Sequence, residues 1–174
     1  MEFENKTIVI TGAAGIFGRW IAAYFAKEGA RLCLSDIRMD GLEKAVAELG
    51  LDRSKVLLHQ TELTSDASML DFVELVKREW GAPDFLVNNA GIYTRFSLLD
   101  MEFSDWDRVF GVNLRAPFVL SREFAKLMIA EGKDYMFFSP WVIMIPGVAL
   151  AILVLGINLV GDGLRNLLGA ERLR

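Results

Sequence analysis

Three glycines at intervals of three residues form the sequence feature best suited to chemistry. Gly12, Gly15 and Gly18 directly follow the apolar run 7–11 and precede a segment with helical spacing. In such a loop the first glycine permits a tight turn, the second lets the backbone approach a pyrophosphate, and the third lets the helix pack closely on the strand. The unpaired N–H groups and positive dipole end of the helix favour a bound anion. The pattern therefore predicts a dinucleotide site.

An acidic residue lies 18 positions beyond the last of these glycines. Asp36 ends the apolar run 31–36, and an acid at about this distance binds the ribose hydroxyls of NAD in dinucleotide-binding folds. Its carboxylate would repel the 2′-phosphate of NADP, so the sequence favours NAD. Arg19 and Arg38 are close enough in the sequence to leave NADP as the alternative. Taken by itself, Asp36 equally suits a strand end or a helix cap.

Two more motifs follow the glycine loop along the sequence. Asn-Asn-Ala-Gly occupies 88–91 after an apolar run, and Val-Asn-Leu occupies 112–114 within a helical pattern. Together with Thr-Gly-x-x-Gly-x-x-Gly at 11–18, this order and spacing resembles the short-chain dehydrogenase/reductase family across residues 5–133. The resemblance implies an α/β Rossmann-like fold and a cofactor site that includes Asn89, Ala90 and Gly91. It also implies adenine contacts from Glu62 and Leu63, and a loop lined by Ile16 and Phe17.

The same resemblance implies hydride transfer between a nicotinamide cofactor and an alcohol or carbonyl substrate. Family members use a Tyr as general acid/base, with a Lys four residues later that lowers its pKa, because a free Tyr with a pKa of about 10 is a poor base near neutral pH. Asn113 matches the Asn of the proton relay. Ser139 is the candidate for the Ser that orients substrate, although a serine before proline is more commonly a turn residue. No Tyr-x-x-x-Lys occurs in the sequence, so we expect an oxidoreductase type with impaired catalysis.

The apolar pattern that must position these residues alternates between short runs and helical segments, which predicts a parallel sheet wrapped by helices. The predicted strand order is 3-2-1-4, with 135–139 as a candidate fifth strand. The predicted strands are 7–11, 31–36, 55–60 and 84–88, and the predicted helices are 15–28, 41–49, 65–80 and 103–131. In the last helix we expect Trp106, Phe110, Leu114, Phe118 and Leu120 to face the sheet.

Charge divides the chain into unlike parts. Of its 42 Asp, Glu, Lys and Arg residues, none falls within 135–161. The 20 residues 141–160 are long enough to span a bilayer as a helix, since about 20 residues suffice. We therefore expect a Rossmann half-domain at 1–134, a hydrophobic transmembrane segment at 135–161 and a polar tail at 162–174. The alternative for the apolar segment is a buried strand followed by a core helix.

The final segment has a resemblance of its own. Through the stretches 140–147 and 155–166, residues 136–174 look like the C-terminal end of dipeptide/oligopeptide ABC-transporter permeases. The abrupt loss of charge near 132–136 prompts the hypothesis that the chain joins a truncated reductase to a permease end. Two alternative functions follow: an NAD-binding module tethered to a membrane without catalysis, and a remnant of a permease subunit.

Bulk composition excludes some classes of function. A net charge of −4 and a pI near 5.1 offer no basic surface for nucleic acid. The single cysteine, Cys33, stands in an apolar run and is expected to be buried and inert. No leader peptide is indicated, so we expect a cytoplasmic N-terminal domain, associated with a membrane if residues 135–161 insert.

Overall fold

The computed structural model describes residues 2–93 and 100–133. The chain separates into two compact units, 1–134 and 135–174, and the described residues all belong to the first. The predicted transmembrane segment, the permease-like stretch and Ser139 lie outside the described residues. Within 2–93 and 100–133, no helix is both long and apolar enough to cross a bilayer.

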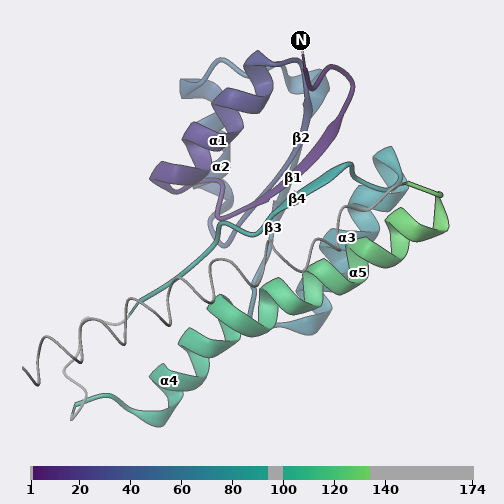
Figure 1. Ribbon diagram of the computed structural model, residues 1–174. Helices are drawn as coiled ribbons and strands as arrows, with labels where there is room; N and C mark the ends of the chain where they lie inside the picture. The colour runs from purple at the N-terminus through teal and green to yellow at the C-terminus, as the bar shows by residue number, and fades with distance from the viewer. Residues whose placement is uncertain (1, 94–99, 134–174) are drawn as a thin grey trace, which may run out of the picture. The chain divides into compact units, whose positions relative to one another are not determined.

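Four parallel strands form the centre of the described unit (Figure 1). They are β1 (Thr7–Thr11), β2 (Arg31–Asp36), β3 (Val56–Gln60) and β4 (Phe85–Val87). Their order, β3-β2-β1-β4, confirms the predicted one. All five residues of β1 are buried, which is typical of a central parallel strand covered on both faces.

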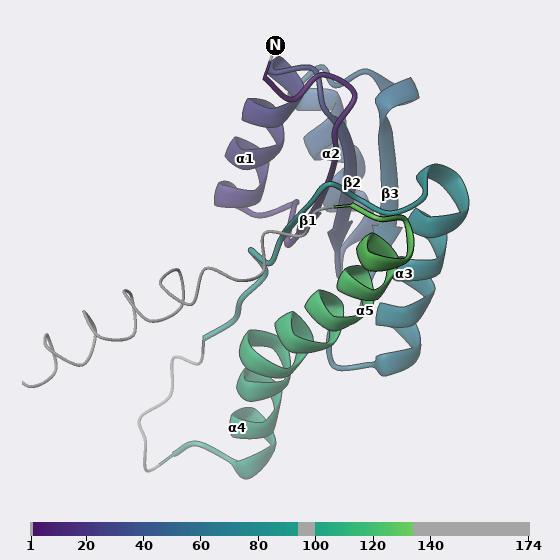
Figure 2. The ribbon, with the colours of Figure 1, turned by 45° about the vertical axis from the view of Figure 1, so that its right-hand side comes forward.

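Helices cover both faces of this sheet. Figure 2 shows α1 (Ile16–Lys27) and α2 (Met39–Glu48) on one face, with α3 (Asp66–Trp80) and α5 (Ala116–Ala130) on the other. The remaining elements are the short helix η1 (Arg53–Lys55), α4 (Phe103–Phe110) and the π-helical turn η2 (Gly111–Arg115), which joins α4 to α5. This helix-sheet-helix layering is the Rossmann-like architecture that the sequence pattern predicts.

Successive residues of a strand point to opposite faces of the sheet, and two hydrophobic cores result. Ile8 and Ile10 pack toward α1 and α2 in one core. Val9 and Cys33 pack in the other with residues of α3 and α5, among them Phe72. Cys33 is fully buried, and burial raises the pKa of its thiol to about 12. The expectation of a buried cysteine is therefore confirmed.

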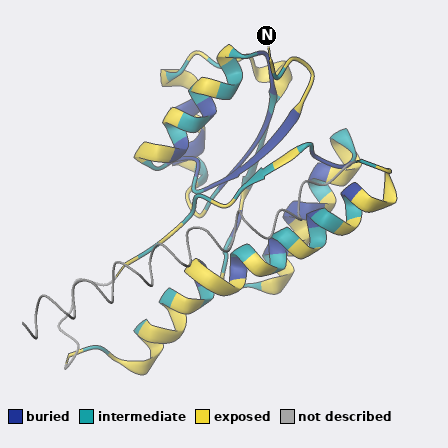
Figure 3. Ribbon diagram, viewed as in Figure 1, coloured by how far each residue is buried: buried dark blue, intermediate teal, exposed yellow. Residues whose placement is uncertain are grey.

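The long helical segment after β4 corrects one prediction. Of the five residues expected to face the sheet, only Leu120 is buried, whereas Trp106, Phe110, Leu114 and Phe118 are exposed. Positions 118 and 120 lie about 200° apart around an α-helix, so they cannot share a face. The stripe that does face the sheet repeats every four residues and comprises Val112, Ala116, Leu120, Phe124 and Met128. The predicted single helix is also interrupted by η2, and α4 has no buried residue (Figure 3).

Candidate functional site

The loop between β1 and α1 can be built only with glycine at two of its positions. Gly12 adopts a φ of +65°, and a Cβ there would lie 2.8 Å from the Cα of Ala90. At Gly18 a Cβ would lie 2.3 Å from the carbonyl oxygen of Gly12 and 2.7 Å from the Cα of Ala13. These neighbours are backbone atoms, which cannot move aside as a flexible side chain can. The first and third glycines therefore have the steric roles that the motif predicts.

The middle glycine leaves the helix N-terminus open. Gly15 is the N-cap of α1 and supplies no side-chain hydrogen bond to it. The first N–H groups of an α-helix have no intrahelical partner. In α1 they include the N–H groups of Ile16 and Phe17, and both residues line the pocket described below. No acidic residue stands in the first turn, so a bound anion would meet no carboxylate of α1 there. This end of α1 suits a phosphate.

Asp36 lies at the carboxyl end of β2 beside this loop. One of its oxygens accepts a hydrogen bond from the backbone N–H of Ala14 (3.0 Å), and the other from that of Arg38 (3.2 Å). The Arg38 guanidinium also lies 4.0 Å from the carboxylate. Because each carboxylate oxygen has two acceptor positions, both retain capacity for the hydroxyls of a bound ribose. Asp36 thus has a fixed orientation and free acceptor sites.

The end of β4 is tied to the glycine loop through Asn89. Its side-chain amide donates to the carbonyl oxygens of Thr11 (2.9 Å) and Gly12 (3.2 Å). The Thr11 hydroxyl in turn accepts from the backbone N–H groups of Asn89 and Ala90, both at 3.1 Å. These four bonds hold the Ala90 backbone against Gly12. The motif at 88–91 therefore acts here as a brace for the loop.

Asn113 braces the next stretch of chain. Its amide donates to the carbonyl oxygen of Ile92 (2.7 Å) and accepts from the N–H of the same residue (2.8 Å). This reciprocal pair fixes the segment after Gly91 to η2. Asn113 lies next to the pocket without lining it, and its place in a proton relay stays a prediction.

Glu62 and Leu63 lie just beyond β3. A Glu62 carboxylate oxygen accepts from the backbone N–H (3.1 Å) and the hydroxyl (2.8 Å) of Thr64, so the loop orients this side chain.

Thr61 is buried, and its hydroxyl accepts from Ser35 (2.7 Å) and lies 2.8 Å from Nδ1 of His59. Burial lowers the pKa of His59, which favours the neutral ring as the acceptor of the Thr61 proton.

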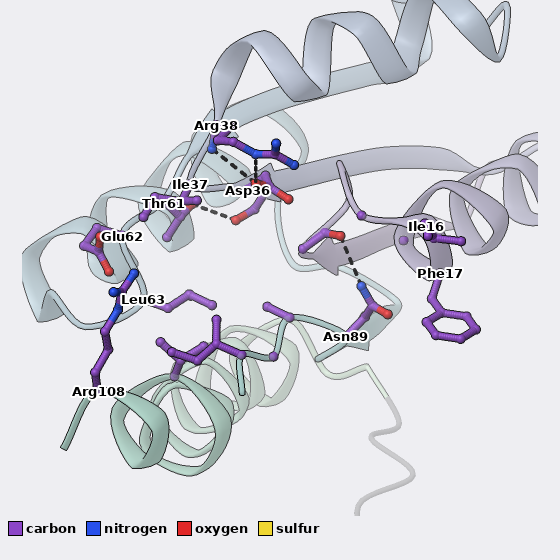
Figure 4. Close-up of a pocket in the computed structure, with 18 residues that line it drawn as sticks. Ile16, Phe17, Asp36, Ile37, Arg38, Thr61, Glu62, Leu63, Asn89 and Arg108 are labelled. Carbon is purple, nitrogen blue, oxygen red and sulfur yellow. Dashed lines mark hydrogen bonds and ion pairs between the residues drawn. The ribbon is translucent and has the colours of Figure 1, made fainter. Parts of the chain in front are cut away.

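These residues surround one pocket of about 300 Å³ (Figure 4). All eleven residues expected to contact a cofactor line it: Gly12, Gly15, Ile16, Phe17, Gly18, Asp36, Glu62, Leu63, Asn89, Ala90 and Gly91. Seven further residues complete the lining: Ser35, Ile37, Arg38, Thr61, Ile92, Arg108 and Val112.

Part of this additional lining could have been found in the sequence. Ser35 and Thr61 stand at the carboxyl ends of parallel strands, where ligands bind in open α/β sheets. Arg108 and Val112 come from the helical segment after β4, and only its position in space brings them to the pocket. Of the two residues expected to be catalytic, Asn113 lies beside the pocket, and Ser139 falls outside the described residues.

The fold and the pocket together define a nucleotide-binding Rossmann unit. The family model described as short chain dehydrogenase matches residues 6–134. A short chain dehydrogenase/reductase of Macrophomina phaseolina, dpmpG, is 35% identical over 134 residues, which cover 76% of this chain and 77% of that protein. The chain therefore belongs to the short-chain dehydrogenase/reductase family. The family match ends at residue 134, and the comparisons do not support the expected resemblance of 136–174 to a permease.

Solved structures agree with this assignment. NAD+-bound xylitol dehydrogenase superposes with a TM-score of 0.69 at 30% identity, over 77% of this chain and 52% of that chain. A metagenomic short-chain oxidoreductase in complex with NADP gives a TM-score of 0.71 at 30% identity, over 77% and 61%. The chain thus spans between half and two thirds of these structures. Its neighbours include both NAD and NADP complexes, so the fold does not choose between the two.

Proposed function

We propose that this chain binds NAD in the pocket between the carboxyl ends of β1, β2 and β4, as the cofactor-binding part of a short-chain dehydrogenase/reductase. The observation that carries the proposal is the convergence of an uncapped helix N-terminus, an oriented Asp36 and the braced 88–91 segment on one cavity. The three features are distant in sequence and have complementary chemistry for one dinucleotide.

The residues divide the pocket into subsites. The N–H groups at the start of α1 suit the pyrophosphate, and Asp36 suits the hydroxyls of the adenosine ribose. Ile37 and Leu63 offer apolar surface for the adenine, while Ala90 and Ile92 lie toward the other half of the cofactor. Bound NAD would supply a nicotinamide ring that accepts or donates a hydride.

Asp36 favours NAD over NADP. Its side chain is 10% exposed and is held by two backbone N–H groups, so it cannot turn away from a 2′-phosphate without losing both bonds. Arg38 is the group that would favour NADP, but its side chain is 64% exposed and already lies near Asp36. A 2′-phosphate on the ribose would therefore be repelled by the oriented Asp36 carboxylate before it could form an ion pair with Arg38.

Catalysis is the part of the family function that we propose is impaired in this chain. A hydride transfer to or from an alcohol needs a base or acid at the substrate oxygen. No tyrosine in the sequence is followed four positions later by lysine. The Asn113 amide forms one donor and one acceptor bond with the Ile92 backbone. The chain is accordingly proposed to hold the cofactor of an alcohol or carbonyl oxidoreductase without efficient turnover.

Fluorescence titration of the full chain with NADH and NADPH tests the proposal. We expect saturable NADH binding, weaker NADPH binding, and a loss of about tenfold in NADH affinity in Asp36→Ala, since hydrogen bonds to a charged group contribute about 1.5–3 kcal/mol. Asp71→Ala, which removes an exposed acid on α3, is the matched control and should bind NADH normally. Absence of saturable NADH binding to the unaltered chain would overturn the proposal.

Turnover is measured separately, as NAD reduction in the presence of sorbitol or xylitol. We expect a rate at the buffer background. A rate well above that background would show that another group replaces the missing base and would contradict the proposed impairment, while leaving NAD binding intact.

A further inference from the structure

Among the described residues, Arg108 is the one basic lining residue to which the proposed cofactor site gives no role. It lies on α4, 72 positions beyond Asp36 in the sequence, and reaches the pocket from the side opposite to β2. Within residues 2–93 and 100–133, its guanidinium forms no ion pair and no hydrogen bond. By contrast, Arg38 in the same pocket lies beside Asp36, and Arg115 on the neighbouring turn is paired with Asp66.

The position of Arg108 identifies the part of the ligand that it would meet. The pyrophosphate end of the pocket is fixed by the N-terminus of α1, and the ribose position by Asp36. Figure 4 shows the Arg108 side chain rising beside Glu62 and Leu63, at the end of the pocket remote from Ile16 and Phe17. The base attached to the ribose would therefore lie between Ile37 and the Leu63–Arg108 side.

The chemistry of the guanidinium suits this position. It is planar, remains charged at all relevant pH values, and stacks on aromatic faces. The neighbouring Glu62 carboxylate is oriented by Thr64 and is not bonded to Arg108. Because Arg108 is exposed, stacking it on a base would require little desolvation of protein groups.

We propose that Arg108 is a binding residue for the adenine base and stacks its guanidinium on the face of the ring that Ile37 leaves open. This inference rests on the proposed NAD function of the same pocket. It adds a contact from α4, an element that has no buried residue of its own. Cofactor binding would thereby also attach α4 to the rest of the site.

The test compares the full chain with Arg108→Ala, Arg108→Lys and the matched control Arg122→Ala, which removes an exposed arginine of α5 outside the pocket. Dissociation constants are measured for NADH, NADPH and ADP-ribose by calorimetry, after thermal melts verify that each variant is folded. For Arg108→Ala we expect about a fivefold loss of affinity, the scale of one stacked cation. The loss should be equal for NADH and ADP-ribose, because both carry the adenine. Arg108→Lys should recover only part of the lost affinity, because an ammonium keeps the cation–π attraction but lacks the planar face.

Three results would overturn the inference. Unchanged NADH affinity in Arg108→Ala would show that the side chain does not touch the ligand. Full rescue by Arg108→Lys would show that the side chain acts through its charge alone and does not stack a planar face on the base. A loss confined to NADPH would place Arg108 at the 2′-phosphate. In each case the unaltered chain still binds NADH; if it binds neither NADH nor ADP-ribose, the proposed function fails and this inference fails with it.

Discussion

At the scale of single residues, the site is defined by close backbone approaches and short polar braces. Gly12 and Gly18 are required because backbone atoms occupy the space of their missing side chains. Thr11 and Asn89 join the loop to β4 through their hydrogen bonds, and Asn113 joins the segment after β4 to η2. Most residues of the motifs thus build the pocket, and Asp36 is the residue that we propose recognises the ribose through its free acceptor positions.

Gly18→Ala tests the steric role of the third glycine. The added Cβ would lie 2.3 Å from a backbone oxygen, so the loop must shift, and overpacking of this kind costs about 1–3 kcal/mol. We expect a lower free energy of unfolding and a loss of NADH binding. Urea unfolding and NADH titration measure the two effects.

Gly111→Ala is the matched control for that substitution. Its Cβ would meet only the Thr64 methyl group at 3.5 Å, and alanine is favoured over glycine within a helix by about 1 kcal/mol. We expect unchanged or slightly higher stability. Equal behaviour of the two alanine variants would contradict the claim that the third glycine is sterically required.

At the scale of elements, the sequence predicts the sheet better than the last helix. Alternating apolar runs place every strand within two residues of its observed bounds, because buried parallel strands are short and nearly continuous in hydrophobicity. The helix prediction at 103–131 was right in extent but wrong in orientation and continuity. Aromatic and aliphatic residues occur on both sides of this helix, so the positions of its large hydrophobic side chains did not identify the stripe that contacts the sheet.

Alanine substitutions on the two sides of that helix test the corrected orientation. Leu120 is 1% exposed and packs with α3, whereas Leu114 is 64% exposed. Leu120→Ala should lower the free energy of unfolding by about 2–5 kcal/mol, the usual range for a buried leucine. Leu114→Ala should change it by less than about 0.5 kcal/mol. Urea unfolding followed by circular dichroism compares them, and comparable losses at positions 114 and 120 would support the original prediction that both face the sheet.

At the scale of the whole molecule, the described lining of the candidate cofactor pocket lies within the part that matches the family. Its lining runs from Gly12 to Val112, inside the matched residues 6–134. Among the described residues, this lining is drawn from the elements β1 to η2 and the loops that join them. The proposed NAD binding and the proposed loss of turnover are therefore tested by separate measurements.

The candidate site could be predicted from the sequence to the extent that motifs encode backbone geometry. The glycines and the Asn-Asn-Ala-Gly turn are such motifs, and the residues expected from them line one pocket. Ser35 and Thr61 were missed because no motif contains them, although the strand-end rule applies to both. The presence of Arg108 in the pocket lining could not be predicted from the sequence, because it depends on where α4 lies relative to the end of β3.

Hydrogen–deuterium exchange of the full chain, with and without saturating NADH, tests the central claim that this pocket holds the cofactor. NADH should slow exchange in the glycine loop 12–18, after β2 at 36–38, after β3 at 61–63 and after β4 at 89–92, because these segments surround the cavity. Exchange in the far part of α5, at 122–130, should not change. Protection confined to residues outside the pocket, or no protection at saturation, would contradict the account.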